Sequence, residues 1–156
     1  MDALKSDIRE IQPTDPSILP LIDRHLTMMY ASSPACSVHA MDADQLSEPG
    51  VRFFAVLEDG LAIAMGALKT VSTVHGELKS MHVRDDRRGE GLADAMLAHL
   101  IDVARASGMT RVSLETGSQD AFVPARRFYQ RHGFVFCGPF EGYVEDPASV
   151  FLTREV

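Results

Sequence analysis

Apolar residues in the later half of the chain follow the spacing of an amphipathic helix. Between residues 90 and 107 they recur every three or four positions and share one face, at Leu92, Met96, Leu100, Val103 and Ala104. Gly108 follows this pattern and suits a helix C-terminus, where glycine adopts the left-handed conformation at little cost. A second helix is expected over residues 124–132, because Pro124 suits a first turn and Gly133 follows the end.

Shorter apolar runs between turn signals predict β-strands. Residues 52–58 and 61–71 flank Asp59-Gly60, a dipeptide typical of a tight hairpin. Residues 111–115 are expected to form a buried strand after the long helix. The remaining strands are expected at residues 6–12, 77–83, 134–137 and 150–153.

The order of these elements predicts a single α/β domain over residues 1–156. The first half contains a hairpin and the second half alternates strand and helix, so we expect a mixed sheet flanked by helices. A further helix is expected over residues 17–31, after the turn at residues 13–16. Residues 31–48, rich in Ser, Pro and Ala, are expected to form a loop with one short helix that could cover a substrate entrance.

Composition agrees with one domain and places it in the cytoplasm. The chain has 156 residues, of which 46% are hydrophobic, and this is enough for one sizeable core. Its longest apolar stretches, such as residues 61–68, fall well short of the ~20 residues that cross a bilayer. The N-terminus lacks a basic segment followed by an apolar one. We therefore expect a cytoplasmic protein without a signal peptide or a membrane partner.

The charged residues and cysteines narrow the possible partners. A formal net charge of −7 argues against a general nucleic-acid binder and leaves room for cationic substrates. Cys36 and Cys137 form no Cys-x-x-Cys pair and the histidines lack metal-ligand spacing, so we expect neither a disulfide framework nor a metal. Six arginines lie near the two later helices, as one basic zone or two solvated faces: Arg84, Arg87, Arg88, Arg126, Arg127 and Arg131.

A glycine-rich segment opens the long helix, with the sequence Arg88-Gly89-Glu90-Gly91-Leu92-Ala93. Such a turn leaves backbone N–H groups unpaired at the positive end of the helix dipole, which favours a bound anion such as a pyrophosphate. The dinucleotide-binding fingerprint is not matched, because Asp94 stands where it needs Gly or Ala. The P-loop of NTPases does not occur in the chain.

Two motifs with intact spacing lie at these helices, Arg88-x-x-Gly91-x-Ala93 and Ala125-x-x-Phe128-Tyr129-x-x-x-Gly133-Phe134. They resemble the two signature segments of the GCN5-related N-acetyltransferases, the GNAT superfamily. The resemblance spans residues 51–137, while residues 115–117 and 147–151 are similar to small bacterial members of undefined acceptor. It implies a GNAT fold with a mostly antiparallel sheet, and acetyl-CoA as cosubstrate without a metal. The residues that would bind the cofactor are Met81, His82, Val83, Arg88, Gly89, Glu90, Gly91, Leu92, Ala93, Phe128 and Tyr129.

In that family a neutral amine attacks the thioester carbonyl directly and the coenzyme A thiolate leaves. The resemblance assigns Tyr129 as the acid that protonates or hydrogen-bonds the thiolate. Glu77 is the leading candidate for the base that deprotonates the acceptor. It lies six residues before Val83, so a regular strand places both on one face, whereas a β-bulge would change that. Alternative bases are His75, His82 and Glu115, and a water chain could replace them all.

The resemblance therefore implies an acetyl-CoA-dependent N-acetyltransferase that acts on a small-molecule amine or on a peptide lysine or N-terminus. An acyl-CoA-binding sensor without turnover needs the same glycine-rich turn, and the retained Tyr129 favours the enzyme. A purely structural protein would have no affinity for the cofactor. For Phe140 and Tyr143 two positions are open, the wall of an acceptor pocket or the core. Met28 and Met29 are expected in the core. A homodimer is expected, because it is common in the family.

Overall fold

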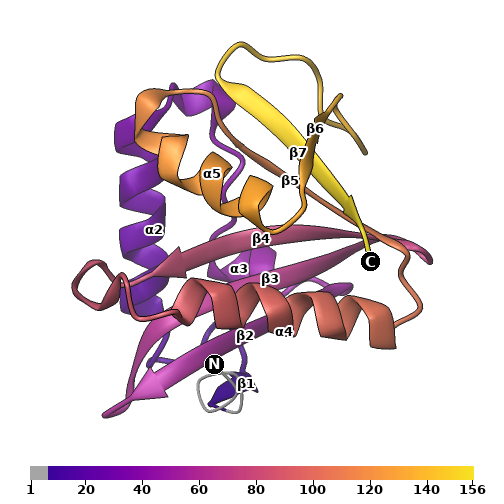
Figure 1. Ribbon diagram of the computed structural model, residues 1–156. Coiled ribbons are helices and arrows are strands. Elements are labelled where there is room, and N and C mark those ends of the chain that lie inside the picture. The colour runs from indigo at the N-terminus through magenta and orange to yellow at the C-terminus, as the bar shows by residue number, and fades with distance from the viewer. Residues whose placement is uncertain (1–6) are drawn as a thin grey trace.

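The computed structural model describes residues 7–156, which form one seven-stranded sheet with helices on both faces (Figure 1). The strand order is β1-β2-β3-β4-β5-β7-β6. All neighbouring strands are antiparallel except β4 and β5, so the predicted mixed and mostly antiparallel sheet is confirmed. The strands are β1 (Ile8–Glu10), β2 (Val51–Glu58), β3 (Leu61–Ser72), β4 (His75–Val83), β5 (Arg111–Gly117), β6 (Val135–Cys137) and β7 (Ser149–Glu155).

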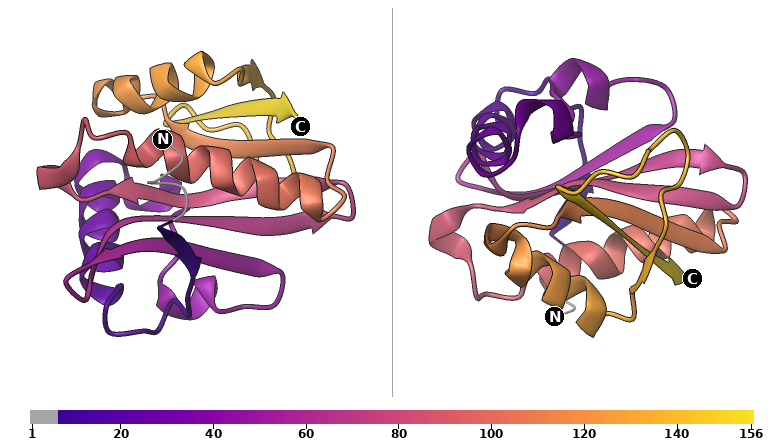
Figure 2. Two further views of the ribbon diagram at one scale, coloured as in Figure 1. Left: turned by 60° about the horizontal axis from the view of Figure 1, so that its bottom comes forward. Right: turned by 90° about the horizontal axis from the view of Figure 1, so that it is seen from above.

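Helices cover both faces of the sheet. On one face lie α4 (Leu92–Ala106) and α5 (Val123–Arg131), and on the other lie α2 (Leu19–Ser32) and α3 (Ala43–Leu46) (Figures 1 and 2). Each face has its own apolar core, because successive side chains of a strand point to opposite sides. Met96 and Leu100 of α4 belong to the first core, and Ile22 of α2 belongs to the second.

The hydrophobic periodicity and the turn residues position these elements. The helix predicted over residues 90–107 runs from Leu92 to Ala106, and Gly91 (φ 84°) and Gly108 (φ 83°) flank it in the left-handed conformation. The predicted hairpin is also confirmed, because Asp59 (φ 52°) and Gly60 (φ 79°) form a two-residue turn between β2 and β3.

Two sequence predictions need correction at the N-terminal half. Residues 31–48 contain a 3-10 helix (Ala35–Ser37) as well as α3, not one short helix. A capping box begins α3, in which Asp42 Oδ1 accepts from the Gln45 N–H and Gln45 Oε1 accepts from the Asp42 N–H, both at 2.9 Å. The first strand, predicted over residues 6–12, is confined to Ile8–Glu10 within the described residues, and residue 6 lies outside them.

A β-bulge interrupts β4 and reverses the direction of its side chains. His82 pairs with Met65 and Lys79 pairs with Ala67, so Ser80 and Met81 together face Gly66. Ser80 adopts a left-handed conformation (φ 56°) at this point. Before the bulge, Glu77 points to the α2 face; after it, Val83 packs in the core under α4. Glu77 and Val83 therefore lie on opposite faces of the sheet. A regular strand would have placed them on the same face.

Gly66 of β3 lies opposite the bulge, in a closely packed place. A Cβ atom on Gly66 would lie 2.8 Å from Met81 Sδ and 2.9 Å from Leu100 Cδ1, so the ends of these side chains would have to move to admit it. The pairing of β4 with β5 ends before the bulge, since their parallel register covers only residues 75–77 and 111–113. The two strands therefore separate at their C-terminal ends, between α2 and α5. Across residues 7–156, no helix combines the length and the apolar character that spanning a bilayer requires.

Candidate active site

A cleft of about 460 Å³ lies where β4, the N-terminus of α4 and α5 meet. Its walls combine the end of β4, the glycine-rich turn and one side of α5. Nearly all predicted cofactor-binding residues line it; the exception is Glu90, which lies in the turn but outside the lining. The predicted residues found on its walls are Met81, His82, Val83, Arg88, Gly89, Gly91, Leu92, Ala93, Phe128 and Tyr129.

The turn before α4 presents free backbone donors to this cleft. Gly89 and Gly91 have positive φ angles, and Gly91 is the N-cap residue of α4 without a side-chain cap. The first hydrogen bond of the helix is donated by the Ala95 N–H to the Gly91 carbonyl. The N–H groups of residues 92–94 therefore have no carbonyl partner within the helix. These donors and the positive end of the helix dipole fit a bound phosphate group. The cleft residues therefore fit the pyrophosphate of a coenzyme A ester.

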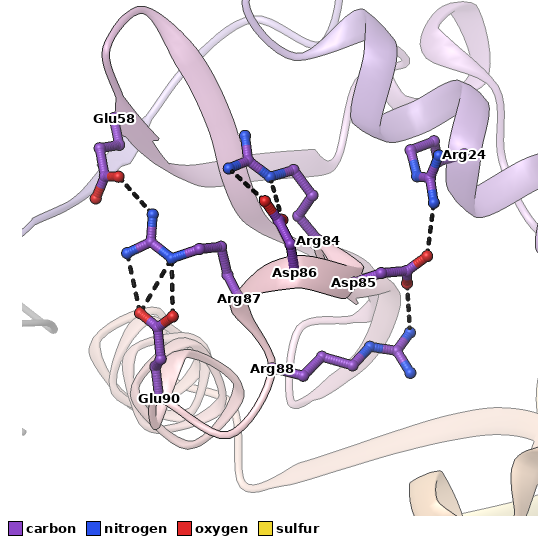
Figure 3. A network of polar contacts seen from close by, with 8 residues as sticks. All are labelled: Arg24, Glu58, Arg84, Asp85, Asp86, Arg87, Arg88 and Glu90. Carbon is purple, nitrogen blue, oxygen red and sulfur yellow. Dashed lines mark hydrogen bonds and ion pairs between the residues drawn. The ribbon is translucent and has the colours of Figure 1, made fainter.

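The arginines around the turn are held by carboxylates (Figure 3). Asp85 bridges Arg88, at 3.2 Å, and Arg24 of α2, at 2.6 Å. Arg87 pairs with both Glu58 and Glu90, so one guanidinium group holds the two carboxylates. Arg87, Arg88 and Arg131 all line the cleft, so the two arginine groups do adjoin, although carboxylates balance much of their charge.

Tyr129 lies deep in the cleft, on the side of α5 that faces the sheet. Its side chain is 8% exposed and packs against the rings of Phe128 and Phe134. Burial raises the pKa of the Tyr129 phenol well above its usual range. The hydroxyl therefore keeps its proton at neutral pH and can donate it or a hydrogen bond.

A second cavity, of about 120 Å³, adjoins the cleft at Tyr129 and occupies the gap between the separated strands β4 and β5. The two share Met28, Met81, Phe122, Ala125 and Tyr129 as lining residues. Met28 and Met29 of α2, expected in the core, line these cavities instead. The gap between β4 and β5 explains the difference, because it leaves the end of α2 without a sheet surface to pack against.

Glu77, the leading candidate base, is engaged by other side chains outside these two cavities. It is 3% exposed and accepts a hydrogen bond of 2.5 Å from the Tyr143 hydroxyl. Lys79 Nζ lies 3.5 Å from its carboxylate and donates to the Tyr143 hydroxyl and the His39 carbonyl. Tyr143 therefore belongs to this polar cluster, which lines a third cavity on the α2 face.

The alternative bases lie in three different surroundings. Glu115 of β5 lines the second cavity beside Tyr129. His75 lies at the far end of β4, where its Nε2 atom contacts Ser113 Oγ at 2.7 Å. His82 lines the cleft, and its Nδ1 atom contacts His25 Nδ1 at 3.2 Å. His25 was not predicted at the site, because its partner His82 lies 57 positions away in the sequence. Lys79 was not predicted either, although its alternation with Glu77 along the strand could have indicated it.

The His25–His82 pair predicts a loss of stability in mild acid. Burial is the main cause that lowers the pKa of His25 to about 3 and of His82 to about 4. The charges of His82 and Lys79 lower the pKa of His25 further, those of Arg88 and Arg24 lower the pKa of His82, and the charge of Asp85 raises the pKa of His82. The unfolded chain takes up these protons near pH 6.5, whereas the folded chain resists them. The free energy of unfolding should therefore fall by roughly 2 kcal/mol or more between pH 7 and pH 5.

Urea unfolding followed by circular dichroism at a series of pH values measures this change. A His25→Gln variant provides the control, because removal of one titrating ring should make the dependence shallower. An equal slope in the variant and the original chain would refute the assignment to this pair.

Comparison with known proteins identifies one family. Residues 18–134 match the model of the Acetyltransferase (GNAT) family. N-acetyltransferase YsnE of Bacillus subtilis is 40% identical over 143 residues, covering 92% of this chain and 95% of that protein. The IAA acetyltransferase of Azospirillum brasilense is 35% identical over 135 residues, covering 85% and 84%. An acyl-CoA N-acyltransferase structure from Klebsiella pneumoniae aligns with a TM-score of 0.77 at 27% identity, over 95% of both chains.

The described residues 7–156 hold no group of three or more His, Cys, Asp and Glu side chains placed to bind a metal ion. Cys36 and Cys137 are free thiols.

Proposed function

The chain belongs to the acetyltransferase (GNAT) family and is therefore an acyltransferase, and we propose that it transfers an acetyl group from acetyl-CoA to a primary amine. The acceptor is a small molecule or a lysine or N-terminus of a peptide. The observation that carries the proposal is the position of Tyr129, at the point where the cleft meets the second cavity. A thioester at this point is within reach of an acceptor from the α2 side. The cytoplasmic location and the homodimer stay predictions.

The turn and α4 bind the cofactor in this proposal. The N–H groups of residues 92–94 hold the pyrophosphate, and Arg88 contributes charge after release from Asp85. Met81 and Val83 line the cleft after the bulge, and a backbone N–H of one of them polarises the thioester oxygen. Acetyl-CoA supplies an acyl group that a neutral amine can attack.

Tyr129 acts as the acid. The raised pKa keeps its phenol protonated, so the hydroxyl stabilises or protonates the leaving sulfur. Amine attack and thiolate departure then need no covalent intermediate on the protein.

Replacement of Arg88 by Ala should weaken acetyl-CoA binding about tenfold, because one charge-assisted contact to a phosphate is lost at a side chain that is 58% exposed. Calorimetric titration at low salt measures the effect, and the difference should shrink at high salt. Arg105→Ala is the matched control, because Arg105 is similarly exposed at the other end of α4. Equal losses in both variants would remove Arg88 from the binding site.

The proposal as a whole is tested by calorimetric titration with acetyl-CoA, followed by measurement of thiol release against a panel of amines. Binding with amine-dependent thiol release supports the transferase. Binding without release by any amine favours an acyl-CoA sensor, and a failure to bind acetyl-CoA contradicts the proposed cosubstrate.

A further inference from the structure

We propose that Glu115, and not Glu77, binds the ammonium group of the acceptor and takes its proton. The inference rests on the proposed acetyl transfer and names the group that performs one of its steps. Three observations carry it: the cavity that Glu115 lines, the absence of an ion-pair partner in the described structure, and the partial burial of the side chain.

The position of Glu115 follows from the separation of β4 and β5. Pairing between the two strands stops at Ser113, and β5 continues alone on that side through residues 114–117. Leu114 points into the core under α4, so the alternation of the strand directs Glu115 to the opposite face. There it lines the 120 Å³ cavity together with Tyr129, which places a carboxylate and the proposed acid around one small space.

Glu77, which is buried, and Glu115, which is partly buried, differ in the side chains that already bind them. Glu77 accepts a hydrogen bond from Tyr143 and pairs with Lys79, so its charge is balanced, and it lines the third cavity. No residue between 7 and 156 forms an ion pair of 4.0 Å or less with Glu115. Its carboxylate is therefore open to a cationic ligand, whereas Glu77 holds Lys79 and Tyr143 in position.

The surroundings of Glu115 also suit proton transfer. Burial raises the pKa of the Glu115 carboxyl above its usual range, while the Ser149 hydroxyl on β7, His39 and Lys79 lower it and Glu77 raises it. A carboxylate with a raised pKa is a stronger base at neutral pH and still releases its proton to water. A partly buried carboxylate without an ion-pair partner also favours a cation over a neutral ligand of the same shape.

The proton balance of the step is complete. An N–H bond of the ammonium group breaks and its proton moves to a Glu115 carboxylate oxygen, which leaves the nitrogen lone pair free. That pair forms the C–N bond while the C–S bond breaks, and the sulfur takes a proton from Tyr129. The second proton lost by the nitrogen restores Tyr129, and Glu115 returns its proton to water, so each turnover releases one proton.

The first test measures binding and does not need turnover. Calorimetry with n-butylammonium and n-butanol, on protein saturated with coenzyme A, compares a cation with a neutral molecule of similar shape. The original chain should bind n-butylammonium at least tenfold more tightly than n-butanol, and Glu115→Gln should abolish this preference. The proposal is overturned if the preference is absent from the original chain or persists in the variant.

The second test measures kinetics with the amine that releases thiol fastest. In Glu115→Gln, kcat/KM for the amine should fall 100-fold or more, and its rise with pH through the carboxyl pKa should disappear, while KM for acetyl-CoA stays the same. Glu141→Gln is a charge control, because Glu141 is an exposed residue of the late loop. Loss of the pH dependence in Glu77→Gln, with its retention in Glu115→Gln, would return the role to Glu77. A chain that binds the ammonium ion but never releases thiol would refute the proposed transfer and leave the binding site standing.

Discussion

Replacement of Tyr129 by Phe is expected to slow acetyl transfer about 100-fold or more, because the leaving thiolate loses its proton donor. The ring itself stays, so the contacts with Phe128 and Phe134 and the shape of the cleft are preserved. The loss should therefore fall on kcat, whereas the affinity for acetyl-CoA should stay the same. Steady-state thiol release and calorimetric titration of the same preparation measure the two quantities.

Tyr30→Phe is the matched control for this prediction. Tyr30 lies on α2 with its side chain 57% exposed, so the loss of its hydroxyl touches neither cavity. Transfer at the original rate in Tyr129→Phe would show that water protonates the sulfur. A loss of acetyl-CoA affinity equal to the loss of rate would instead indicate a binding role.

Replacement of Gly91 by Val should weaken acetyl-CoA binding roughly 100-fold or more, which corresponds to about 2.7 kcal/mol. Two physical causes act together. Gly91 has φ 84°, a conformation that a β-branched residue resists by roughly 1–2 kcal/mol. It also lines the cleft at the start of α4, where an isopropyl group would take the place of a bound phosphate.

Gly108→Val separates these two causes. Gly108 has nearly the same φ angle, 83°, at the other end of α4, and a Cβ atom there would meet no other atom within 4 Å. Both variants should lose a similar amount of thermal stability, whereas only Gly91→Val should lose affinity. Weakened binding in both would mean that α4 transmits strain to the cleft, and normal binding in Gly91→Val would place the phosphate elsewhere.

Local patterns in the sequence predict the helices, strands and turns around the proposed cofactor cleft. The apolar stripe of α4, the glycines at its ends and the Asp59-Gly60 turn each depend on a few neighbouring residues, and the structure confirms the elements they predict. The glycine-rich turn and Tyr129 meet in one cleft for the same reason, because each sits at a fixed position on a predicted helix.

The acceptor side depends on contacts between distant segments, which no local pattern encodes. Met28 and Met29 have the spacing of core residues and become cavity walls only because β4 and β5 separate. His25 meets His82 across two elements, and Glu77 meets Tyr143 from a loop 66 positions later. The choice between Glu77 and Glu115 follows from these contacts, and so it could not be made from the sequence.

The bulge in β4 changes which residues of the strand face α2 before and after it. Lys79 and His82 are three positions apart, yet both point to the α2 face, because Ser80 and Met81 together occupy the space of one residue in the ladder. Odd-numbered residues of β4 therefore face α2 before the bulge, and even-numbered residues face α2 after it. If the strand ran without the bulge and no residue were removed, regular alternation would instead place His82 and Val83 on the faces opposite to those they now occupy. Along β4, the number of residues matters as much as their chemistry.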